Sequence, residues 1–512
     1  MKNLADFKRH IFKYKYVFLL IALLSLGAYL NALDNAFVSD DIGAIVKNER
    51  LGDLLVPLKE FNLNMLLRNL IFVCFGRSLL AYHAANTLLH TLATILVYFF
   101  VLIVTTDRRI SCFVSLLFAL HPIHTEAVSW VSGSGYVFYS VFFLIAFIFY
   151  HLYLENRGKT PYLLGSLICY SIAVLTSLWA IPMAVVFFLY EKYLKGRRIN
   201  WRFYLVLGLV IGLRLFFLRG AATVRISSLA GGGGGLSLRN PLITIPHSLT
   251  QYLLLLFWPI NLALYHEGEI LTRTYLWAAR TLALIFLLVL PIIFRRKKLF
   301  IFFWLFFLIS ISLSLSPMQI SWYVAERYLY LGSVSFCVLI SYLLVWLEKK
   351  TNLRGLAAAL LVPILSFYFI RTVIRNNDWQ SRASLWFATA KVSPRSPRVH
   401  NNLGDIYGGW GDLDNAIKEF EIARKLQPGY ADATHNLGNT YLQRGDLENA
   451  KKYFLEATEY NPQLYQSFYS LGVISYHEGN REEAKRYFEK ALSINPDYEA
   501  AQQALEVLES EK

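Results

Sequence analysis

The chain has 512 residues, of which 56% are hydrophobic and only 17% are charged, and its mean hydropathy is +0.41. Because an ordinary soluble domain carries about 25% charged residues, this composition argues against a soluble enzyme and predicts a membrane protein. The formal net charge is +15, but the residues from Pro397 onward carry 12 Lys and Arg against 19 Asp and Glu, so the residues before them carry +22. Much of that charge lies in short loops between apolar segments, which indicates membrane topology rather than nucleic-acid binding.

Apolar segments of spanning length recur along residues 1–375. Five Lys and Arg precede the first of them, Val17 to Leu33, which predicts a retained signal anchor. Further candidate spans lie near 83–104, 110–121, 136–154, 161–177, 179–194, 200–218, 274–294, 299–316, 328–347 and 355–373. Together they predict eleven transmembrane helices.

The basic loops give these spans an orientation. With eleven spans, the clusters fall on the side of the N-terminus, in agreement with the positive-inside rule: Arg108–Arg109, Arg157–Lys159, Lys192–Arg198, Arg295–Lys298 and Lys349–Arg354. The segment Pro241 to Phe257 is then an interfacial or re-entrant helix on the outer side. We expect a multi-pass protein of the inner (plasma) membrane with a cytoplasmic N-terminus. The first external loop, about residues 35–82, and the C-terminal part lie on the periplasmic or extracytoplasmic side.

Two adjacent carboxylates, Asp40 and Asp41, follow the first span within FVSDDIGAIVKN. Acidic pairs are common at solvated loop ends, which is one interpretation. The other is functional, because charge near the lipid boundary is costly and is usually kept for a purpose. A partly desolvated carboxylate there would have a raised pKa, which suits a general base.

Four further blocks accompany the acidic pair: AYHAANTLLH from Ala81, FALHPIHTEAVSWV from Phe118, FWPINLALYH from Phe257 and AERYLYLGS from Ala325. Their order and spacing resemble those of the transmembrane-and-tetratricopeptide O-mannosyltransferases and their bacterial relatives. These are glycosyltransferases of the GT-C class, which use polyprenyl-phosphate-linked sugars. The resemblance implies an all-α fold in which a GT-C-type membrane domain precedes a solenoid of repeats.

The resemblance also implies roles for single residues. Asp40 would be the base that deprotonates an acceptor hydroxyl, and Asp41 would orient that acceptor or hold a divalent cation; no other cofactor is implied. The candidates for binding the donor phosphate are Arg327, Arg68, Arg214 and His266, and the candidates for lining the cavity are His121, His124, Glu126, Glu326 and Tyr328. Arg327 is the preferred cation, the alternative being an internal ion pair with Glu326 or another acid. His121, His124 and Glu126 could bind Zn²⁺, but they lack a helical HExxH frame.

The chain departs from the bacterial pattern at three places. Gly133 to Tyr136 carries no charge where relatives have a charged stretch, Leu178 replaces a Lys, and Gly332 replaces a Pro. Two cations expected at a phosphate or sugar site are therefore absent, which would alter donor binding or abolish activity.

Three copies of a 34-residue pattern follow the membrane part: Pro397 to Tyr430, Ala431 to Leu464 and Tyr465 to Tyr498. Gly404, Gly438 and Gly472 fall in register, as do Pro428, Pro462 and Pro496, which identifies tetratricopeptide repeats. Residues 376–396 are expected to form a capping half-repeat and residues 499–512 a capping helix. Asn402, Asn436 and Asn439 could hold an acceptor peptide, or could bond between helices.

These expectations define one function and two alternatives. The chain is expected to be an inverting hexosyltransferase that moves a sugar, such as mannose, from a polyprenyl-phosphate donor in the bilayer to Ser or Thr of an acceptor protein. The repeats would recruit that acceptor. The alternatives are a non-catalytic scaffold for envelope assembly and a transferase acting on glycolipid or polysaccharide.

Overall fold

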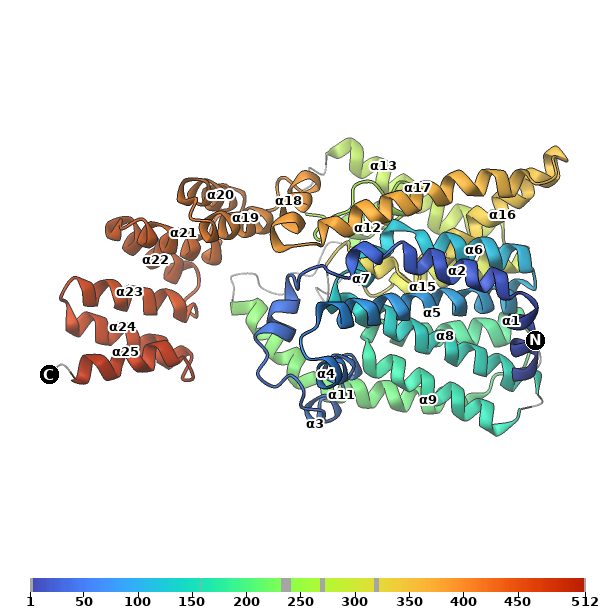
Figure 1. Cartoon of the computed structure of the whole chain (residues 1–512), viewed down its shortest axis with the longest axis horizontal. Coiled ribbons are helices and arrows are strands. Elements are labelled where there is room, and N and C mark those ends of the chain that lie inside the picture. Colours follow the sequence, from blue (N-terminus) through green and yellow to red (C-terminus); the bar gives the residue numbers. More distant parts are fainter. Residues whose placement is uncertain (1–2, 157, 232–240, 268–271, 317–321, 511–512) are drawn as a thin grey trace. The chain divides into compact units, whose positions relative to one another are not determined.

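The computed structural model describes residues 3–156, 158–231, 241–267, 272–316 and 322–510, apart from the side chains of residues 218–231. Throughout these ranges the ordered elements are helices, as the sequence predicts (Figure 1). The chain divides into two units. The first contains Met1–Arg219, Leu238–Tyr265 and Leu271–Leu385, and the second contains Gly220–Ser237, His266–Ile270 and Trp386–Lys512.

The described helices up to the repeats are α1 Leu4–Lys13, α2 Lys15–Gly27, α3 Leu55–Lys59, α4 Leu63–Phe75, α5 Leu79–Thr105, α6 Arg108–Leu120, α7 Thr125–Val128, α8 Ser134–Glu155, α9 Thr160–Thr176, α10 Ala184–Phe188, α11 Trp201–Gly231, α12 Pro241–Phe257, α13 Arg273–Leu284, α14 Leu290–Ile293, α15 Lys298–Ile311, α16 Ser333–Thr351, α17 Leu356–Asp378 and α18 Arg382–Val392. Short 3₁₀ or π turns lie between them: η1 Leu30–Ala32, η2 Ile42–Val46, η3 Pro122–His124, η4 Val131–Gly133, η5 Leu178–Met183, η6 Leu189–Leu194, η7 Ile285–Val289 and η8 Glu326–Leu329.

Five helical segments of the described chain are long and apolar enough to cross a bilayer: Lys15–Ala32, Leu79–Thr105, Val131–Glu155, Arg273–Ile293 and Leu356–Asp378. A sixth is added if Arg108–Leu120 and Pro122–Val128, which meet at a 53° bend, count as one broken span. The protein therefore has five to six candidate spans, and the count of eleven stays a prediction.

The difference arises where apolar sequence is broken by turns. Residues 179–194, expected as one span, consist of η5, the five-residue α10 and η6. Segments 161–177 and 299–316 correspond to α9 and α15, of 17 and 14 residues. α12, expected to lie at the interface, also has 17 residues. Hydropathy alone does not reveal these interruptions.

The core of the first unit forms around α5, which packs against α2, α6 and α8 (Figure 1). Seventeen of its 27 residues are buried, so both flanks of this helix contact protein. Thr87, Thr91 and Thr94 donate their hydroxyls to carbonyls one turn back, which satisfies these polar groups inside an apolar helix.

The second unit contains the repeats: α19 Pro397–Gly409, α20 Leu413–Leu426, α21 Ala431–Gln443, α22 Leu447–Tyr460, α23 Tyr465–His477, α24 Arg481–Ile494 and α25 Glu499–Ser510. The in-register glycines lie where two helices touch. A Cβ on Gly404, Gly438 or Gly472 would lie 2.6, 2.9 or 2.5 Å from a phenylalanine ring of the paired helix. Phe387 of α18 packs against Tyr407 and Trp410. The capping roles of α18 and α25 stay predictions.

Candidate functional site

Asp41 is buried and held in place by a distant segment of the chain. Ser132 of η4 donates both its backbone N–H, at 2.8 Å, and its hydroxyl, at 2.5 Å, to Oδ1 of Asp41. The backbone N–H of Val38 donates to Oδ2 at 3.3 Å. Ser39, with φ of 53°, turns the chain between Val38 and the acidic pair. The loop after the first candidate span is thus attached to the start of the span that contains α8.

Asp40 is in the opposite situation. It is exposed, and within the described ranges its carboxylate has no hydrogen-bond partner. Neighbouring carboxylates with such different surroundings are suited to different tasks. Asp41 is engaged in holding the loop, whereas the carboxylate of Asp40 is open to solvent.

Burial raises the pKa of Asp41 to about 6, and the hydrogen bonds from Ser132 and Val38 and the positive charge of Arg68 oppose that rise. The shift is the one expected for a desolvated carboxyl. Arg68 is the sequence-predicted cation that acts on both Asp40 and Asp41. Its Nε is buried without a hydrogen-bond partner in the described part of the chain.

Helix α4 positions Arg68. Asn62 caps the start of this helix by accepting the N–H of Met65 at 3.1 Å. Ser134 of α8 donates to Asn64 at 3.1 Å, and Tyr82 of α5 donates its hydroxyl to the carbonyl of Arg68 at 3.1 Å. Hydrogen bonds to both α8 and α5 therefore fix the helix that carries the guanidinium.

The stretch that lacks charge, Gly133 to Tyr136, is closely packed. A Cβ on Gly133 would lie 2.4 Å from the carbonyl oxygen of Glu126, and one on Gly135 would lie 3.2 Å from the amide nitrogen of Asn64. Side chains at these two positions would displace backbone or the Asn64 amide. The uncharged stretch thus coincides with the docking of α4. Gly332 is similarly crowded, with Ser310 Oγ at 2.4 Å from its Cβ position.

Arg327 lies in a buried ion pair with Glu126. Its backbone N–H donates to Oε2 of Glu126 at 2.7 Å and its guanidinium donates to Oε1. The guanidinium also lies over the rings of Trp130 and Tyr328, at 5.4 and 4.9 Å from their centroids. The internal ion pair considered from the sequence is therefore present, with Glu126 rather than the adjacent Glu326 as partner. Arg327 is already neutralised.

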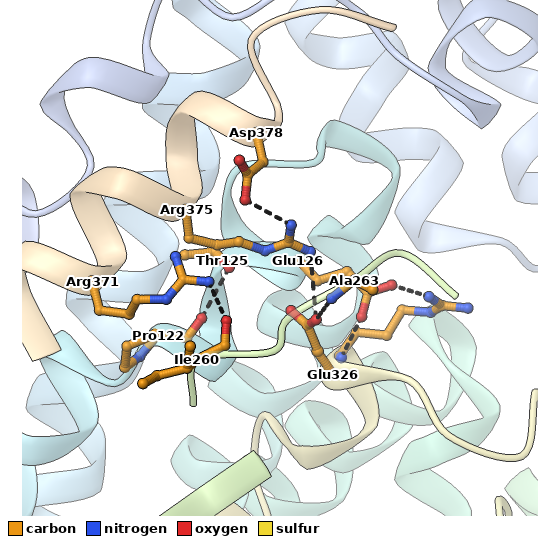
Figure 2. A network of polar contacts seen from close by, with 10 residues as sticks. Pro122, Thr125, Glu126, Ile260, Ala263, Glu326, Arg371, Arg375 and Asp378 are labelled. Carbon is orange, nitrogen blue, oxygen red and sulfur yellow. Dashed lines mark hydrogen bonds and ion pairs between the residues drawn. The ribbon is translucent and has the colours of Figure 1, made fainter. Parts of the chain in front are cut away.

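Glu326 belongs to a second set of contacts beside this pair (Figure 2). It accepts the backbone N–H of Ala263 at 2.5 Å and pairs with Arg375 at 3.4 Å. Arg375 pairs also with Asp378 at 2.9 Å. These buried charges join η8, the segment after α12 and the end of α17, and such a network holds elements in register.

The two histidines of HPIHTE are fully buried and bonded to protein groups. His121 Nε2 lies 3.1 Å from the carbonyl oxygen of Leu256, and His124 Nε2 lies 2.9 Å from the hydroxyl of Ser333. Among the described residues, no group of three or more His, Cys, Asp and Glu is arranged to hold a metal ion. Tyr328 stacks on Trp179, with centroids 4.2 Å apart.

A divalent cation does not fit the acidic pair well. Three protein donors already occupy the oxygens of Asp41, whereas Mg²⁺ and Ca²⁺ need several oxygen ligands. The reaction proposed for this chain involves no divalent cation.

Two donor-phosphate candidates remain, Arg214 and His266. Arg214 of α11 donates to the carbonyls of Glu60 and Phe61, at 3.2 and 2.5 Å, so its guanidinium holds backbone. His266 belongs to the second unit.

The asparagines of the repeats bond mostly within the solenoid. Asn402 donates to the carbonyl of Arg398 at 2.8 Å, Asn436 to Asn401 at 3.1 Å, and Asn439 lies 3.0 Å from His435. Only Asn436 makes the bond between helices that the sequence left open, whereas Asn402 and Asn439 bond within their own helices.

Sequence reasoning missed Ser132 and Asn64, the residues that place Asp41 and Arg68. Both are small polar residues in apolar surroundings, which is a weak signal. Their partners lie 91 and 70 residues away, and no local spacing links such positions.

Comparison with known proteins agrees with both parts of the chain. The tetratricopeptide-repeat family models match residues 397–430, 431–464 and 465–498. A protein O-mannosyl-transferase of Caenorhabditis elegans is 26% identical over 450 residues, covering 80% of this chain and 63% of its own. One from Homo sapiens is 27% identical over 511 residues, covering 81% and 55%. The chain is therefore a distant homologue of protein O-mannosyl-transferases and spans between half and two thirds of the length of these curated relatives.

Among solved structures, the crystal structure of the MamA protein is 22% identical and covers 25% of this chain and 69% of its own, with a TM-score of 0.23. A score this low adds nothing to the repeat assignment.

Proposed function

We propose that this distant homologue of protein O-mannosyl-transferases is an inverting membrane glycosyltransferase. It moves a hexosyl group, with mannose the first to test, from a polyprenyl-phosphate donor to Ser or Thr hydroxyls on the extracytoplasmic face. The observation that carries the proposal is the exposed, unbonded Asp40 beside the buried Asp41, with Arg68 acting on both. This arrangement provides a base and a cation at one loop.

Asp40 serves as the general base. A Ser or Thr hydroxyl is a poor nucleophile until its proton is removed, so Asp40 takes that proton as the hydroxyl oxygen bonds to the anomeric carbon. The bond from that carbon to the phosphate oxygen breaks, and the phosphate leaves with the electron pair. Attack from the opposite face inverts the anomeric configuration.

Arg68 stabilises the leaving phosphate. A guanidinium can bind phosphate through two parallel N–H donors, and a charge that is in place before the reaction stabilises the developing anion. Arg327 is less suited to this role because Glu126 already neutralises it. Asp41 orients the loop and does not touch the reacting atoms.

The repeats recruit the acceptor protein in this proposal, on the same extracytoplasmic side as Asp40. The basic loops, which all fall on the side of the N-terminus if the predicted eleven spans are present, support that placement. Three repeats form a short surface, suited to a few residues of extended peptide.

A strain lacking the gene tests the acceptor class. Intact-mass analysis of its exported proteins should show the loss of a hexose-sized modification. Unchanged proteins with an altered glycolipid or polysaccharide would identify the acceptor as a glycan, and no change in either would favour a non-catalytic scaffold. The scaffold alternative draws support from the missing charges at Gly133–Tyr136 and Leu178.

A further inference from the structure

A cavity of about 300 Å³ opens between the end of α8, η6 and the segment that precedes α11. It is lined by Tyr153, Leu154, Gly158, Glu191, Arg197, Arg198 and Asn200. The last turn of α8 lies on the side of the first unit where the N-terminus lies, whereas α4 lies on the opposite side of that unit (Figure 1). The cavity is therefore separate from the acidic pair, and the proposed transferase reaction does not use it.

The deepest charged group in the cavity is Glu191, which is 1% exposed. Its Oε2 accepts the hydroxyls of Tyr150 and Tyr204, at 2.9 and 3.1 Å, and lies 3.4 Å from the backbone nitrogen of Asn200. Within the described ranges no Lys, Arg or His pairs with this carboxylate, and its Oε1 receives no hydrogen bond. A buried carboxylate without a counter-ion is costly, so this cavity favours a ligand with positive charge.

Two arginines supply the opposite charge at the mouth of the cavity. Arg198 is exposed, and among the described residues no acid pairs with it. One guanidinium nitrogen of Arg197 donates to the carbonyl of Leu154, and the other lies 4.0 Å from the carboxylate of Glu155. Because Lys195 already pairs with Glu155 at 3.0 Å, the two guanidiniums together carry excess positive charge.

The cavity also has an aromatic side, formed by Tyr153. Asn200 donates its amide to the hydroxyl of Tyr153 at 3.0 Å, and the Tyr153 ring stacks on Tyr150 with centroids 6.0 Å apart. A tyrosine face next to a carboxylate is a favourable site for an ammonium group. Tyr153 and Leu154 also lie in the last turn of the candidate span Val131–Glu155, so the cavity opens where that span ends.

We propose that this cavity binds the phosphoethanolamine headgroup of a membrane lipid. The ammonium group donates to Glu191 Oε1 beside the Tyr153 ring, and the phosphate accepts from Arg197 and Arg198 at the mouth. A purely anionic headgroup would leave Glu191 unpaired, and a purely cationic ligand would leave Arg198 unpaired. A zwitterion with the two charges a few bonds apart satisfies both.

The test is a native mass-spectrometry titration of the purified full chain with phosphatidylethanolamine and with phosphatidylglycerol. The wild type should bind phosphatidylethanolamine about tenfold more tightly, the effect of one charge-assisted hydrogen bond. Glu191→Gln keeps an oxygen for the tyrosine hydroxyls and should remove that preference while leaving phosphatidylglycerol binding unchanged. Arg198→Gln, at an exposed position that folding does not require, should weaken the binding of both lipids. Arg354→Gln, exposed in a different loop, is the matched control and should change neither.

Equal affinity of the wild type for the two lipids would overturn the proposal, as would an Arg198→Gln variant that binds both like the wild type. Free phosphoethanolamine is added as a competitor to distinguish the source of the headgroup. If it displaces the lipid at equal concentration, the ligand is a soluble phosphate ester and the assignment to a lipid is wrong. Displacement only at a large excess supports the lipid.

Discussion

The carboxylate of Asp41 accepts two hydrogen bonds from Ser132, a residue 91 positions further along the chain. This contact attaches the loop after the first candidate span to the start of another span and leaves the adjacent Asp40 exposed. The two carboxylates thus differ in role: Asp41 is a positioning residue and Asp40 is the proposed base.

The burial of Asp41 should make stability depend on pH. Its folded pKa of about 6 exceeds its ordinary value of 3.8, so the folded state binds the proton more tightly than the unfolded state. The stability that this group contributes is full below about pH 4 and falls as pH rises to about 6, by roughly 3 kcal/mol. Asp41→Asn lacks this titration. Thermal unfolding in detergent should therefore show the wild-type midpoint falling relative to that of the variant between pH 4 and 6.

Asp34→Asn is the matched control, since Asp34 is exposed in the same loop. The difference between the thermal unfolding midpoints of Asp34→Asn and the wild type should stay constant between pH 4 and 6. A constant offset for Asp41→Asn as well would show that Asp41 is not buried as described.

The ion pair between Arg327 and Glu126 should behave as a structural pair. Arg327→Gln leaves a buried carboxylate without its partner and should destabilise the protein by about 3–5 kcal/mol. The double variant Arg327→Gln with Glu126→Gln removes both charges and should recover most of that loss. The unfolding midpoints of the two single variants and the double variant give the coupling free energy between Arg327 and Glu126. Additive losses would mean that the two side chains act independently.

Arg68 should affect donor binding and turnover without affecting folding. Arg68→Gln removes the cation beside the acidic pair and should lower kcat/KM for the lipid-linked donor by about 10²-fold, with an unfolding midpoint close to that of the wild type. Arg50→Gln, exposed in the same loop, should retain full activity. Unchanged kinetics in Arg68→Gln would assign the phosphate to another cation.

The glycines in register test the packing of the repeats. Gly472→Ala places a Cβ at 2.5 Å from the Phe488 ring and should destabilise the repeats by about 1–3 kcal/mol. Gly409→Ala is the control, because nothing lies within 4 Å of its Cβ position, and it should be neutral or slightly stabilising. Circular dichroism during thermal unfolding compares the two. If the two variants changed the unfolding midpoint equally, the effect of Gly472→Ala would come from helix propensity and not from packing against Phe488.

The repeats could be predicted from the sequence because their signal is local: Gly472 and Phe488 lie within one 34-residue period. The surroundings of the acidic pair could not, since Ser132 and Asp41 meet only through the packing of distant segments. Arg327 shows the same limit. Its neighbour Glu326 was the natural partner in the sequence, but its actual partner, Glu126, lies 201 residues away.

The five to six candidate spans of the described chain are fewer than the eleven predicted, for a related reason. An apolar composition predicts burial in lipid but does not show where a helix ends. Ser177, in extended conformation, ends α9, and η5 begins directly after it. The segment that follows is apolar but consists of short turns.

The central claim is that Asp40 is the base of a glycosyl transfer reaction. The most direct measurement is the transfer of labelled mannose from polyprenyl-phosphate mannose to an acceptor protein by the purified chain in liposomes, comparing wild type, Asp40→Asn and Asp34→Asn. We predict that Asp40→Asn folds normally and loses at least about 10²-fold in rate, whereas Asp34→Asn retains the wild-type rate. An Asp40→Asn variant as active as the wild type would contradict the claim.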